Sequence, residues 1–501
     1  MFYVGIESKL RNFNKGPKAI MTEQIQQTLR DSRAARWTAL FILSFTMFAG
    51  YLFTEIISPL KPILERTPYN WDSTNFGTVT SAYGWFNVFF MLLLVVGILL
   101  DKFGIRFSTI ASVLIMIIGG TIKYVALKTQ FSPDSEILGF KTQVLIVSLG
   151  YAMFGVGVEY AGITVSKSVV KWFTGKEMAL AMGMQVAIAR LGSFVPLAFG
   201  AKVAATFDVP TTVLGGVILL IIGLGAFFYY NMMDRKLDKE LGALDTEEEE
   251  DKFKISDLGS LVKNQGLWLI AILCVLFYSG VFPFYKYGSD LMVNKFGVSE
   301  DWAGFIPSLV PFGTILLTPL FGIIYDRKGR GATIMIIGAL MLFLSHLIFY
   351  LPFITSVGIA IVNVIILGIA FSLVPSAMWP SVPKVVPEKK QLGSAFSFIF
   401  WIQNFGLWGI PLVVGIVLDA TNPGVSDNIS KLSEGFRAEG LTSSQIGEKV
   451  NEMREAGTYP LYDYASTWLI FVGLSFIALI IAFLLKSQDK RNGYGLEQPN
   501  M

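Results

Sequence analysis

Long apolar runs recur along this chain and alternate with short polar segments. About twelve of the runs reach ~20 residues, the length at which an α-helix crosses the hydrocarbon core of a bilayer. The pattern therefore predicts an all-α membrane protein with about twelve transmembrane helices. The expected spans lie near residues 37–60, 75–100, 105–127, 143–170, 178–202 and 209–233 in the first half, and near 266–290, 300–325, 332–352, 357–382, 392–418 and 463–485 in the second.

Polar segments arrange these spans in two groups of six. The segment 234–265 is charged throughout, and it predicts a linker between an N-terminal bundle at 37–233 and a C-terminal bundle at 266–486. A second polar segment, the insert at 420–462, separates the last two spans. Its helical stretches predict a small cap on the outer face of the membrane.

Lysine and arginine residues gather in alternate loops, as with Lys102 and Arg106 after the second span and Arg327 after the eighth. Loops rich in these residues tend to remain in the cytoplasm. The N-terminal arm 1–36 and the tail 487–501 fall on the same side. We therefore expect both termini in the cytoplasm, and we expect the polar tail to be disordered.

The composition supports a membrane protein and argues against several functions. Of the 501 residues, 53% are hydrophobic and 15% are charged, whereas a soluble domain carries roughly a quarter charged residues. The net charge of +3 comes with no basic tract suited to nucleic acid. One histidine, no nucleotide-binding loop and no metal-ligand cluster give no basis for an enzyme, a cofactor or a metal site. The single Cys274 forms no intramolecular disulfide.

One acidic and one basic residue interrupt neighbouring apolar runs. Glu159 lies 174 − 159 = 15 positions before the polar turn at residue 174, and Arg190 lies 190 − 174 = 16 positions after it. At ~1.5 Å per residue both lie ~22–24 Å from the turn, and so at a similar depth near the middle of the membrane. Charged residues at that depth mark functional sites.

Three readings of this pair are open. Glu159 and Arg190 could bind the ammonium and the carboxylate of a zwitterionic substrate through charge-assisted hydrogen bonds. They could instead form a coupling or gating pair, or a permanent buried salt bridge that only fixes helix packing. A related alternative is a carrier of small organic anions in which Arg190 alone holds a carboxylate.

A short motif occurs once in each half of the chain. The sequence GILLDKFGIR at 97–106 matches GIIYDRKGR at 322–330. This GxxxDxxGxR pattern and the parallel repeats of six spans resemble the major facilitator superfamily. The resemblance implies a substrate site between two bundles and a charge latch on the cytoplasmic face, with a plain basic loop and a helix-capping Asp as the alternative. The residues expected to form the latch are Asp101, Arg106, Asp326 and Arg330.

A second set of residues carries a narrower resemblance. They are Trp172, Phe173, Gly175, Lys176, Glu177, Gly183, Gln185, Ala189, Arg190, Gly192 and Ser193 in the first half, and Leu373, Pro375, Ala377, Trp379, Pro380, Val386, Pro387, Glu388, Leu392, Gly393, Ile402, Gln403, Asn404, Gly406, Gly415, Leu418 and Asp419 in the second. They resemble the branch of the superfamily that includes a lysosomal dipeptide uniporter. In that branch an acid on the fourth span and an arginine on the fifth hold the charged ends of a dipeptide. Glu159 and Arg190 occupy those places.

Aromatic residues near mid-membrane are candidates for an adaptable apolar surround of the substrate, with ordinary packing as the alternative for each. They are Tyr83, Trp85, Trp379 and Trp401.

Other polar residues in the spans have simpler interpretations. Lys286 and Asp290, four positions apart at the outer end of the seventh span, predict a surface helix pair, with an outer gate as the alternative. Glu55 is expected to line an exit vestibule, and His346 is expected to be structural. The first span lacks the ExxER-type motif of proton-coupled peptide transporters, which favours a uniporter.

We therefore expect a secondary transporter that moves small zwitterionic solutes, dipeptides first, by alternating access. The alternatives are a proton-coupled or exchange carrier of small organic anions and, from another class, a non-transporting membrane sensor or scaffold. We expect a monomer in the lipid bilayer, with an accessory subunit as an open option. A bacterial inner membrane is favoured over a lysosomal one.

Overall fold

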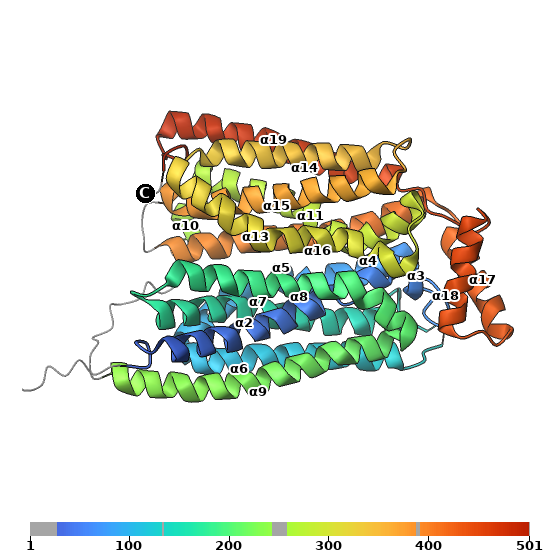
Figure 1. Ribbon diagram of the computed structural model, residues 1–501, viewed down its shortest axis with the longest axis horizontal. Coiled ribbons are helices and arrows are strands. Elements are labelled where there is room, and N and C mark those ends of the chain that lie inside the picture. The colour runs from blue at the N-terminus through green and yellow to red at the C-terminus, as the bar shows by residue number, and fades with distance from the viewer. Residues whose placement is uncertain (1–27, 133–134, 243–257, 387–390, 500–501) are drawn as a thin grey trace, which may run out of the picture.

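The computed structural model describes residues 28–132, 135–242, 258–386 and 391–499, and the statements below concern these residues. Most of them lie in helices that run along the length of the molecule (Figure 1). Eleven of the described helices are long and apolar enough to cross a membrane. The predicted all-α membrane fold is therefore confirmed.

The first half of the chain forms one bundle. Its elements are α2 (Arg33–Glu55), the short 3-10 helix η1 (Ser58–Leu60), α3 (Lys61–Leu64), α4 (Ser73–Ser81), the 3-10 helix η2 (Ala82–Gly84), α5 (Trp85–Phe89), α6 (Leu92–Lys128), the strands β1 (Glu136–Ile137) and β2 (Phe140–Lys141), α7 (Thr142–Phe173), α8 (Met178–Thr206) and α9 (Val209–Leu241). Within this bundle α6 packs against α7, and α2 packs against α8 and α9. The two strands form a small antiparallel hairpin between α6 and α7.

The second half forms the other bundle. Its elements are α10 (Leu258–Leu261), α11 (Gln265–Phe296), α12 (Glu300–Ala303), α13 (Phe305–Lys328), α14 (Gly331–Tyr350), α15 (Val357–Val385), α16 (Leu392–Thr421), α17 (Val425–Ala438), α18 (Ser443–Glu455) and α19 (Ala465–Asn492). Here α15 packs against α13 and α14, and α19 packs against α11 and α14. Figure 1 shows the two bundles side by side along their whole length.

The second predicted span, near 75–100, is not one continuous helix. It consists of α4, η2, α5 and the first turns of α6, and Met91 between α5 and α6 has a left-handed backbone with φ of 50°. This break explains why the described chain has eleven long apolar helices where the sequence predicts about twelve spans. The third span follows after Gly104, whose φ of 75° is a conformation that glycine adopts readily.

The two ends of the molecule differ, and we name them by what they carry. The cap end carries the insert helices α17 and α18, at the right of Figure 1. The linker end carries the end of α9, helix α10 and the C-terminus, at the left of the same view. The basic loops that predict a cytoplasmic face lie at the linker end.

Backbone contacts join the two halves through α4 against α16 and α8 against α13. Glycines make these contacts close at the cap end. A Cβ on Gly77 would lie 2.7 Å from the carbonyl oxygen of Pro411, and a Cβ on Gly415 would lie 2.2 Å from that of Ser73. Because no real Cβ fits at such distances, only glycine allows α4 and α16 to approach this closely.

The polar insert at 420–462 contains α17 and α18, and it also contacts the first half. The backbone N–H of Thr67 donates to Ser433 Oγ at 2.9 Å, and Ser430 Oγ donates to the carbonyl oxygen of Glu65 at 3.2 Å. The insert therefore adds to the contact between the halves at the cap end.

The tail 487–501 is ordered over most of its length, so the prediction of disorder is wrong. Helix α19 runs to Asn492. Glu497 Oε1 then accepts a hydrogen bond from the backbone N–H of Thr333 at 2.8 Å, and Thr333 Oγ1 donates to the same carboxylate. Residues 494–498, which we call the C-terminal strap, thus bind the first turn of α14. The sequence signal for this contact is Glu497, because a carboxylate can accept hydrogen bonds from the free N–H groups at the start of a helix.

Candidate functional site

A cavity with a volume of about 810 Å³ lies between the two halves. Its walls come from α2, α7 and α8 and the broken second span in the first half, and from α11, α13, α15 and α16 in the second. The lining extends toward the linker end, where it includes Leu100, Lys167 and Gly393. The cavity therefore runs from the centre of the molecule to the linker end.

Glu159 projects into this cavity from α7. Its carboxylate Oε1 accepts a hydrogen bond from the hydroxyl of Tyr83 at 2.7 Å. Gly155, one helical turn earlier on the same face of α7, makes this contact possible, because a Cβ there would lie 2.3 Å from the carbonyl oxygen of Tyr83. The glycine thus lets the second span approach α7, and the approach brings the tyrosine to the acid.

Arg190 projects into the same cavity from α8. Its guanidinium carbon lies 4.9 Å from the ring centre of Phe371 on α15 and 5.8 Å from that of Tyr51 on α2. Cation–π contacts of this kind hold a guanidinium in place without using its hydrogen-bond donors. Nη1 of Arg190 is buried and has no hydrogen-bond partner, so the arginine keeps a free donor for a ligand.

Glu159 and Arg190 line one cavity but do not bond to each other. Among the described residues, no ion pair within 4.0 Å joins them, although both side chains are described. The reading of a permanent buried salt bridge is therefore wrong for this state of the protein. An acid and a base that face one cavity from adjacent helices can hold the two ends of a zwitterion.

Two of the four aromatic candidates line the cavity, namely Tyr83 and Trp379. The indole Nε1 of Trp379 donates to the hydroxyl of Tyr278 at 3.2 Å, and its ring lies 5.0 Å from that of Phe400. These contacts fix the indole in an aromatic wall on the second-half side of the cavity.

The other two aromatic candidates, Trp85 and Trp401, lie outside the cavity lining. Trp85 Nε1 donates to Ser81 Oγ at 3.2 Å within its own half. Trp401 Nε1 donates to the carbonyl oxygen of Val88 at 3.2 Å and so joins α16 to the broken second span. Their surroundings match the alternative of ordinary packing.

Ion pairs close the cap end of the cavity. Lys286 Nζ on α11 donates to Glu55 Oε2 on α2 at 2.8 Å. Asp290 Oδ2, one turn further along α11, accepts from Lys61 Nζ on α3 at 2.9 Å. All four residues are buried. The predicted surface pair between Lys286 and Asp290 is therefore wrong, because each binds a residue of the other half. The alternative, an outer gate, fits these contacts.

The linker end of the cavity has no such closure in the described part of the chain. Gly97, Gly183 and Gly393 lie near this end of their helices, and a Cβ on each would meet nothing within 4 Å. In this state the cavity is thus open toward the linker end and closed toward the cap end.

The expected latch residues of the first motif lie at the linker end. Arg106 Nη1 lies 2.9 Å from Asp238 Oδ2, and Lys171 Nζ lies 2.8 Å from Asp234 Oδ1, so both bases bind α9 within their own half. The side chain of Asp101 lies outside the described residues. A latch between the halves stays a prediction for a state in which the linker end is closed.

The second copy of the motif has a different neighbour. Arg330 precedes α14 with a left-handed backbone, and its N–H donates to the carbonyl oxygen of Glu497 in the C-terminal strap at 2.9 Å. Asp326 lies near the end of α13. The strap thus occupies the loop in which the sequence predicts the second half of the latch.

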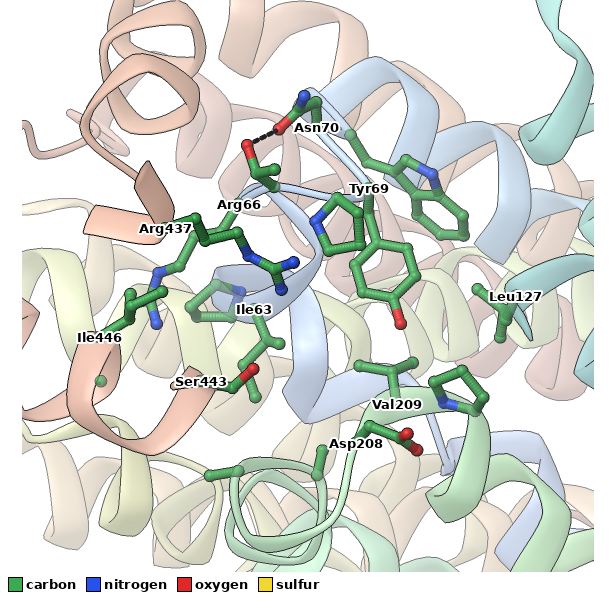
Figure 2. A pocket seen from close by; sticks show the side chains of 18 of the residues that line it. Ile63, Arg66, Tyr69, Asn70, Leu127, Asp208, Val209, Arg437, Ser443 and Ile446 are labelled. Atoms are coloured by element: carbon green, nitrogen blue, oxygen red, sulfur yellow. Dashed lines mark hydrogen bonds between the residues drawn. The ribbon is translucent and has the colours of Figure 1, made fainter. Parts of the chain in front are cut away.

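A second cleft, with a volume of about 880 Å³, lies at the cap end between the first half and the insert (Figure 2). Arg437 and Ile446 of the insert face Tyr69 and Asp208 of the first half across it. Burial raises the pKa of the Tyr69 hydroxyl, and the nearby Asp208 carboxylate adds to the rise. Neither charge of the central pair lines this cleft.

A family model described as the Major Facilitator Superfamily matches residues 43–416. This chain belongs to the Major Facilitator Superfamily. The match confirms the predicted family and fold class, with 416 − 43 + 1 = 374 of 501 residues covered. Members of this superfamily that resemble the chain are transporters rather than enzymes, as the sequence predicts.

Curated relatives from this superfamily match most of the chain. The lysosomal dipeptide transporter MFSD1 of Homo sapiens is 29% identical over 403 residues, which are 77% of this chain and 81% of the relative. The protein of the same name from Danio rerio is 30% identical over 403 residues, again with 77% and 81% coverage.

Solved structures with the same fold are more distant in sequence. A bacterial homologue of the human lysosomal transporter Spinster, in an inward-facing and unoccupied conformation, aligns with a TM-score of 0.64 at 14% identity and covers 92% of this chain and 98% of its own. The nucleoside transporter NupG aligns with a TM-score of 0.60 at 16% identity and covers 89% of this chain and 98% of its own. At such identity the likeness establishes the fold alone.

Sequence reasoning missed several residues around the cavity. Tyr51 lies one helical turn before Glu55, so a search of that helix face would have found it. Lys61 directly follows the first predicted span, and only the structure shows that it is buried and binds Asp290 of the other half. Phe371 gives no signal, because it lies in a uniformly apolar span.

Proposed function

We propose that this protein moves small zwitterionic solutes, dipeptides first, across the membrane by alternating access, as a uniporter. Glu159 binds the substrate ammonium and Arg190 binds its carboxylate. The closed cap end and the open linker end then correspond to one of two states between which the halves rock.

The observation that carries this proposal is the separation of Glu159 and Arg190 in one cavity. A dipeptide loses hydration at both charged ends when it enters, and two opposite charges that are not paired with each other can replace the lost water. A volume of about 810 Å³ falls within the range of ligand pockets and leaves room for varied side chains. The similarity to proteins named as dipeptide transporters supports this choice.

The test uses purified protein and three small probes in a thermal-shift assay, followed by uptake into proteoliposomes. The probes are dialanine, N-acetyl-dialanine without an ammonium, and dialanine amide without a carboxylate. Dialanine should stabilise the protein, because a ligand that binds the folded state raises its melting temperature. Each blocked probe should bind about 10–100-fold more weakly, the value of a hydrogen bond to a charged group.

The variants assign each charge to one end of the substrate. Arg190→Ala should abolish dialanine uptake, and Glu159→Gln should remove the preference for dialanine over its N-acetyl form. Arg437→Ala, which removes an exposed guanidinium from the insert, serves as the control and should transport normally. Normal dialanine uptake by Arg190→Ala would refute the substrate role of the arginine.

A second candidate is the organic-anion carrier. It is favoured by one observation, namely that Glu159 already accepts a hydrogen bond from Tyr83 whereas Arg190 has a free donor. In that case N-acetyl-dialanine would bind as tightly as dialanine, and Glu159→Gln would leave its affinity unchanged. The same probe set thus separates the two functions.

We further infer that the linker end faces the cytoplasm, in a bacterial inner membrane. Exposed bases at this end, among them Lys102, Arg327 and Arg330, support the orientation. A cysteine at Gly183, labelled in right-side-out bacterial membrane vesicles, tests it. A membrane-impermeant maleimide should react only after the vesicles are opened, and reaction in intact vesicles would reverse the orientation.

A further inference from the structure

Two carboxylates share one lysine inside the cap-end gate. Lys61 Nζ lies 2.5 Å from Glu65 Oε1 and 2.9 Å from Asp290 Oδ2. The side chains of Lys61, Glu65 and Asp290 have exposed fractions of 0%, 3% and 1%. Such a group carries a net charge of −1 when all three residues are ionised. A buried excess charge is costly, so one more positive charge would stabilise the site.

The two carboxylates are not equally well satisfied. Asp290 accepts hydrogen bonds from Lys61, from the hydroxyl of Tyr464, and at 3.0 Å from Asn294 Nδ2. Glu65 accepts a side-chain hydrogen bond from Lys61, and the Tyr462 hydroxyl is its one further interacting donor among the described residues. Hydrogen bonds to a carboxylate stabilise its charged form, so Asp290 is the better place for the negative charge and Glu65 the better place for a proton.

The arginines beside the cluster bind another carboxylate, with which they carry a net charge of 2 − 1 = +1, and among the described residues neither donates a hydrogen bond to Glu65. The next residue, Arg66, binds Glu300 on α12, which also accepts from Arg454 Nη1 of the insert at 2.5 Å. Asp72, whose carboxylate interacts with Lys61, is one further titratable group near the cluster, and the others carry hydroxyls. They are Tyr287 on α11, which interacts with Glu65, Lys61 and Asp290, and Tyr462 and Tyr464 before α19.

The cluster lies across the moving interface. Lys61 and Glu65 belong to the first half, and Asp290 and Tyr464 to the second. When the halves separate at the cap end, the contact between Lys61 and Asp290 breaks and water enters the cluster. Hydration then removes the penalty for the second negative charge. The cluster therefore has a different proton affinity in the two states.

We propose that the carboxylate of Glu65 is a proton-binding site of the outer gate, which takes up one proton from the cap-end solution when the gate closes and releases it when the gate opens. No bond other than the O–H bond of the carboxylic acid forms or breaks. The inference rests on the proposed alternation between two states, but not on the identity of the substrate.

The direction of the pH effect follows from the pKa of Glu65 with the gate closed and with the gate open. Glu65 lies one residue beyond the first membrane-spanning segment. With the gate closed, burial raises the pKa of its carboxyl from 4.5 to about 7, opposed by Lys61 and reinforced by Asp290. With the gate open and hydrated, the pKa returns toward 4.5. Between these values the closed gate holds more protons, so a fall in pH from 7 to 5 favours closure.

The second cleft lies beside the segment that carries Glu65. Its lining includes Pro62, Ile63 and Arg66, which flank Glu65 in the sequence (Figure 2). The cleft thus brings solvent from the cap end to the residue next to the buried acid in the sequence, while Glu65 itself does not line the cleft.

The experiment measures gate opening in ligand-free protein. Spin labels at Leu138→Cys in the first half and Thr355→Cys in the second report the distance across the cap end, since both positions are exposed. The single native cysteine, Cys274, is buried and does not interfere. From pH 8 to pH 5 the ratio of closed to open protein should rise by up to about 10²-fold, because one pKa unit corresponds to a tenfold change.

Glu65→Gln replaces the acid by a neutral group of the same shape and should remove the pH dependence. The control, Glu439→Gln, changes an exposed acid of the insert that pairs with Lys449 and should keep it. A pH response of the labelled Glu65→Gln protein equal to that of its parent would overturn the proposal.

Thermal unfolding is a second measurement, and it does not require that the open gate be populated. If Glu65 holds a proton only below about pH 7, Glu65→Gln should melt higher than the parent at pH 8 and at the same temperature at pH 5. A plain structural ion pair with Lys61 predicts the opposite sign at pH 8. A lower melting temperature of Glu65→Gln at pH 8 would refute the proton site, whatever the protein transports.

Discussion

The two ends of the interface between the halves are built differently. At the cap end, buried ion pairs connect the halves, as between Glu55 and Lys286, and glycines let their backbones touch. At the linker end, the ion pairs that the structure describes stay within one half, as between Arg106 and Asp238. The contrast indicates that the cap end determines which state the protein adopts here.

Two spans, the helix α16 and the broken second span, show the same contrast along their length. On α16, a Cβ on Gly415 near the cap end would collide with the other half, whereas a Cβ on Gly393 near the linker end would meet nothing. In the second span, Gly77 and Gly97 differ in the same way. Since Gly415 and Gly393 share one helix, the difference between them lies in the relative tilt of the halves and not in the helix itself.

The largest effect is expected from a break of the cap-end ion pair. Lys286→Met would leave the carboxylate of Glu55 buried without its base. Removal of one partner of a buried pair costs about 3–5 kcal/mol, because the remaining charge is uncompensated. We expect the spin-label distance across the cap end to shift from mainly closed to mainly open.

The control for Lys286→Met is a second substitution, Glu55→Gln. Combined with Lys286→Met it removes both charges, so the double variant should recover much of the closed population. An unchanged distance in Lys286→Met alone would mean that this ion pair does not hold the gate.

A smaller effect is expected from steric pressure at the same end. Gly415→Ala places a methyl group where 2.2 Å separates it from the carbonyl oxygen of Ser73, so the halves must move apart there. Overpacking of this kind costs about 1–3 kcal/mol. The open fraction should rise in the same distance measurement.

The matched control for this change is Gly393→Ala on the same helix. It adds the same methyl group in open space and should leave the distance at both ends unchanged. Equal effects of the two substitutions would show that α16 responds to helix propensity and not to contact with the other half.

At the linker end we expect a substitution to lower the stability of the fold modestly and to leave the balance between the closed and the open gate unchanged. Glu497→Gln weakens the bond of the C-terminal strap to Thr333, and Lys384 on α15 still holds the strap through the carbonyl oxygen of Gly495. The loss should be about 1 kcal/mol, the usual value of one hydrogen bond. The melting temperature should fall slightly while the cap-end distance stays constant. A change in that distance would connect the strap to gating.

The smallest effect is expected for a surface pair at the linker end. Lys176 lowers the pKa of Asp31 to about 2 through a direct hydrogen bond, so the pair stabilises the fold above the ordinary pKa of 3.8 and is lost only as pH falls through about 2. Both side chains are more than a third exposed, and such pairs contribute less than about 1 kcal/mol. Asp31→Asn should leave the melting temperature nearly unchanged from pH 5 to 8. A clear loss would reveal a tighter contact.

The sequence predicts the helices well because membrane spans depend on local composition. All twelve expected spans have helical counterparts, and Glu159 and Arg190, which counting along two helices places at a similar depth, line one cavity. The break at Met91 was not predicted, since nothing in the residues around it resembles a helix stop.

The sequence does not show which residues on different helices bind each other. Lys286 and Asp290 satisfy the spacing for a pair on one helix, yet each binds the opposite half. Trp401 is an aromatic residue of the kind expected to line a substrate cavity, yet its indole N–H donates to the backbone carbonyl of Val88. Both outcomes depend on how two helices are rotated toward each other, and hydrophobic periodicity does not determine that rotation in a uniformly apolar span.

The C-terminal strap has a consequence for the order in which the protein is made. Thr333 at the start of α14 binds Glu497, which the ribosome adds 164 residues later. During synthesis the first turn of α14 therefore stays without this partner until the whole C-terminal bundle has entered the membrane. Leu496, fully buried beside it, completes the contact. A reporter domain fused directly after the strap would compete with this final step, so a spacer between the two should improve the yield of folded protein.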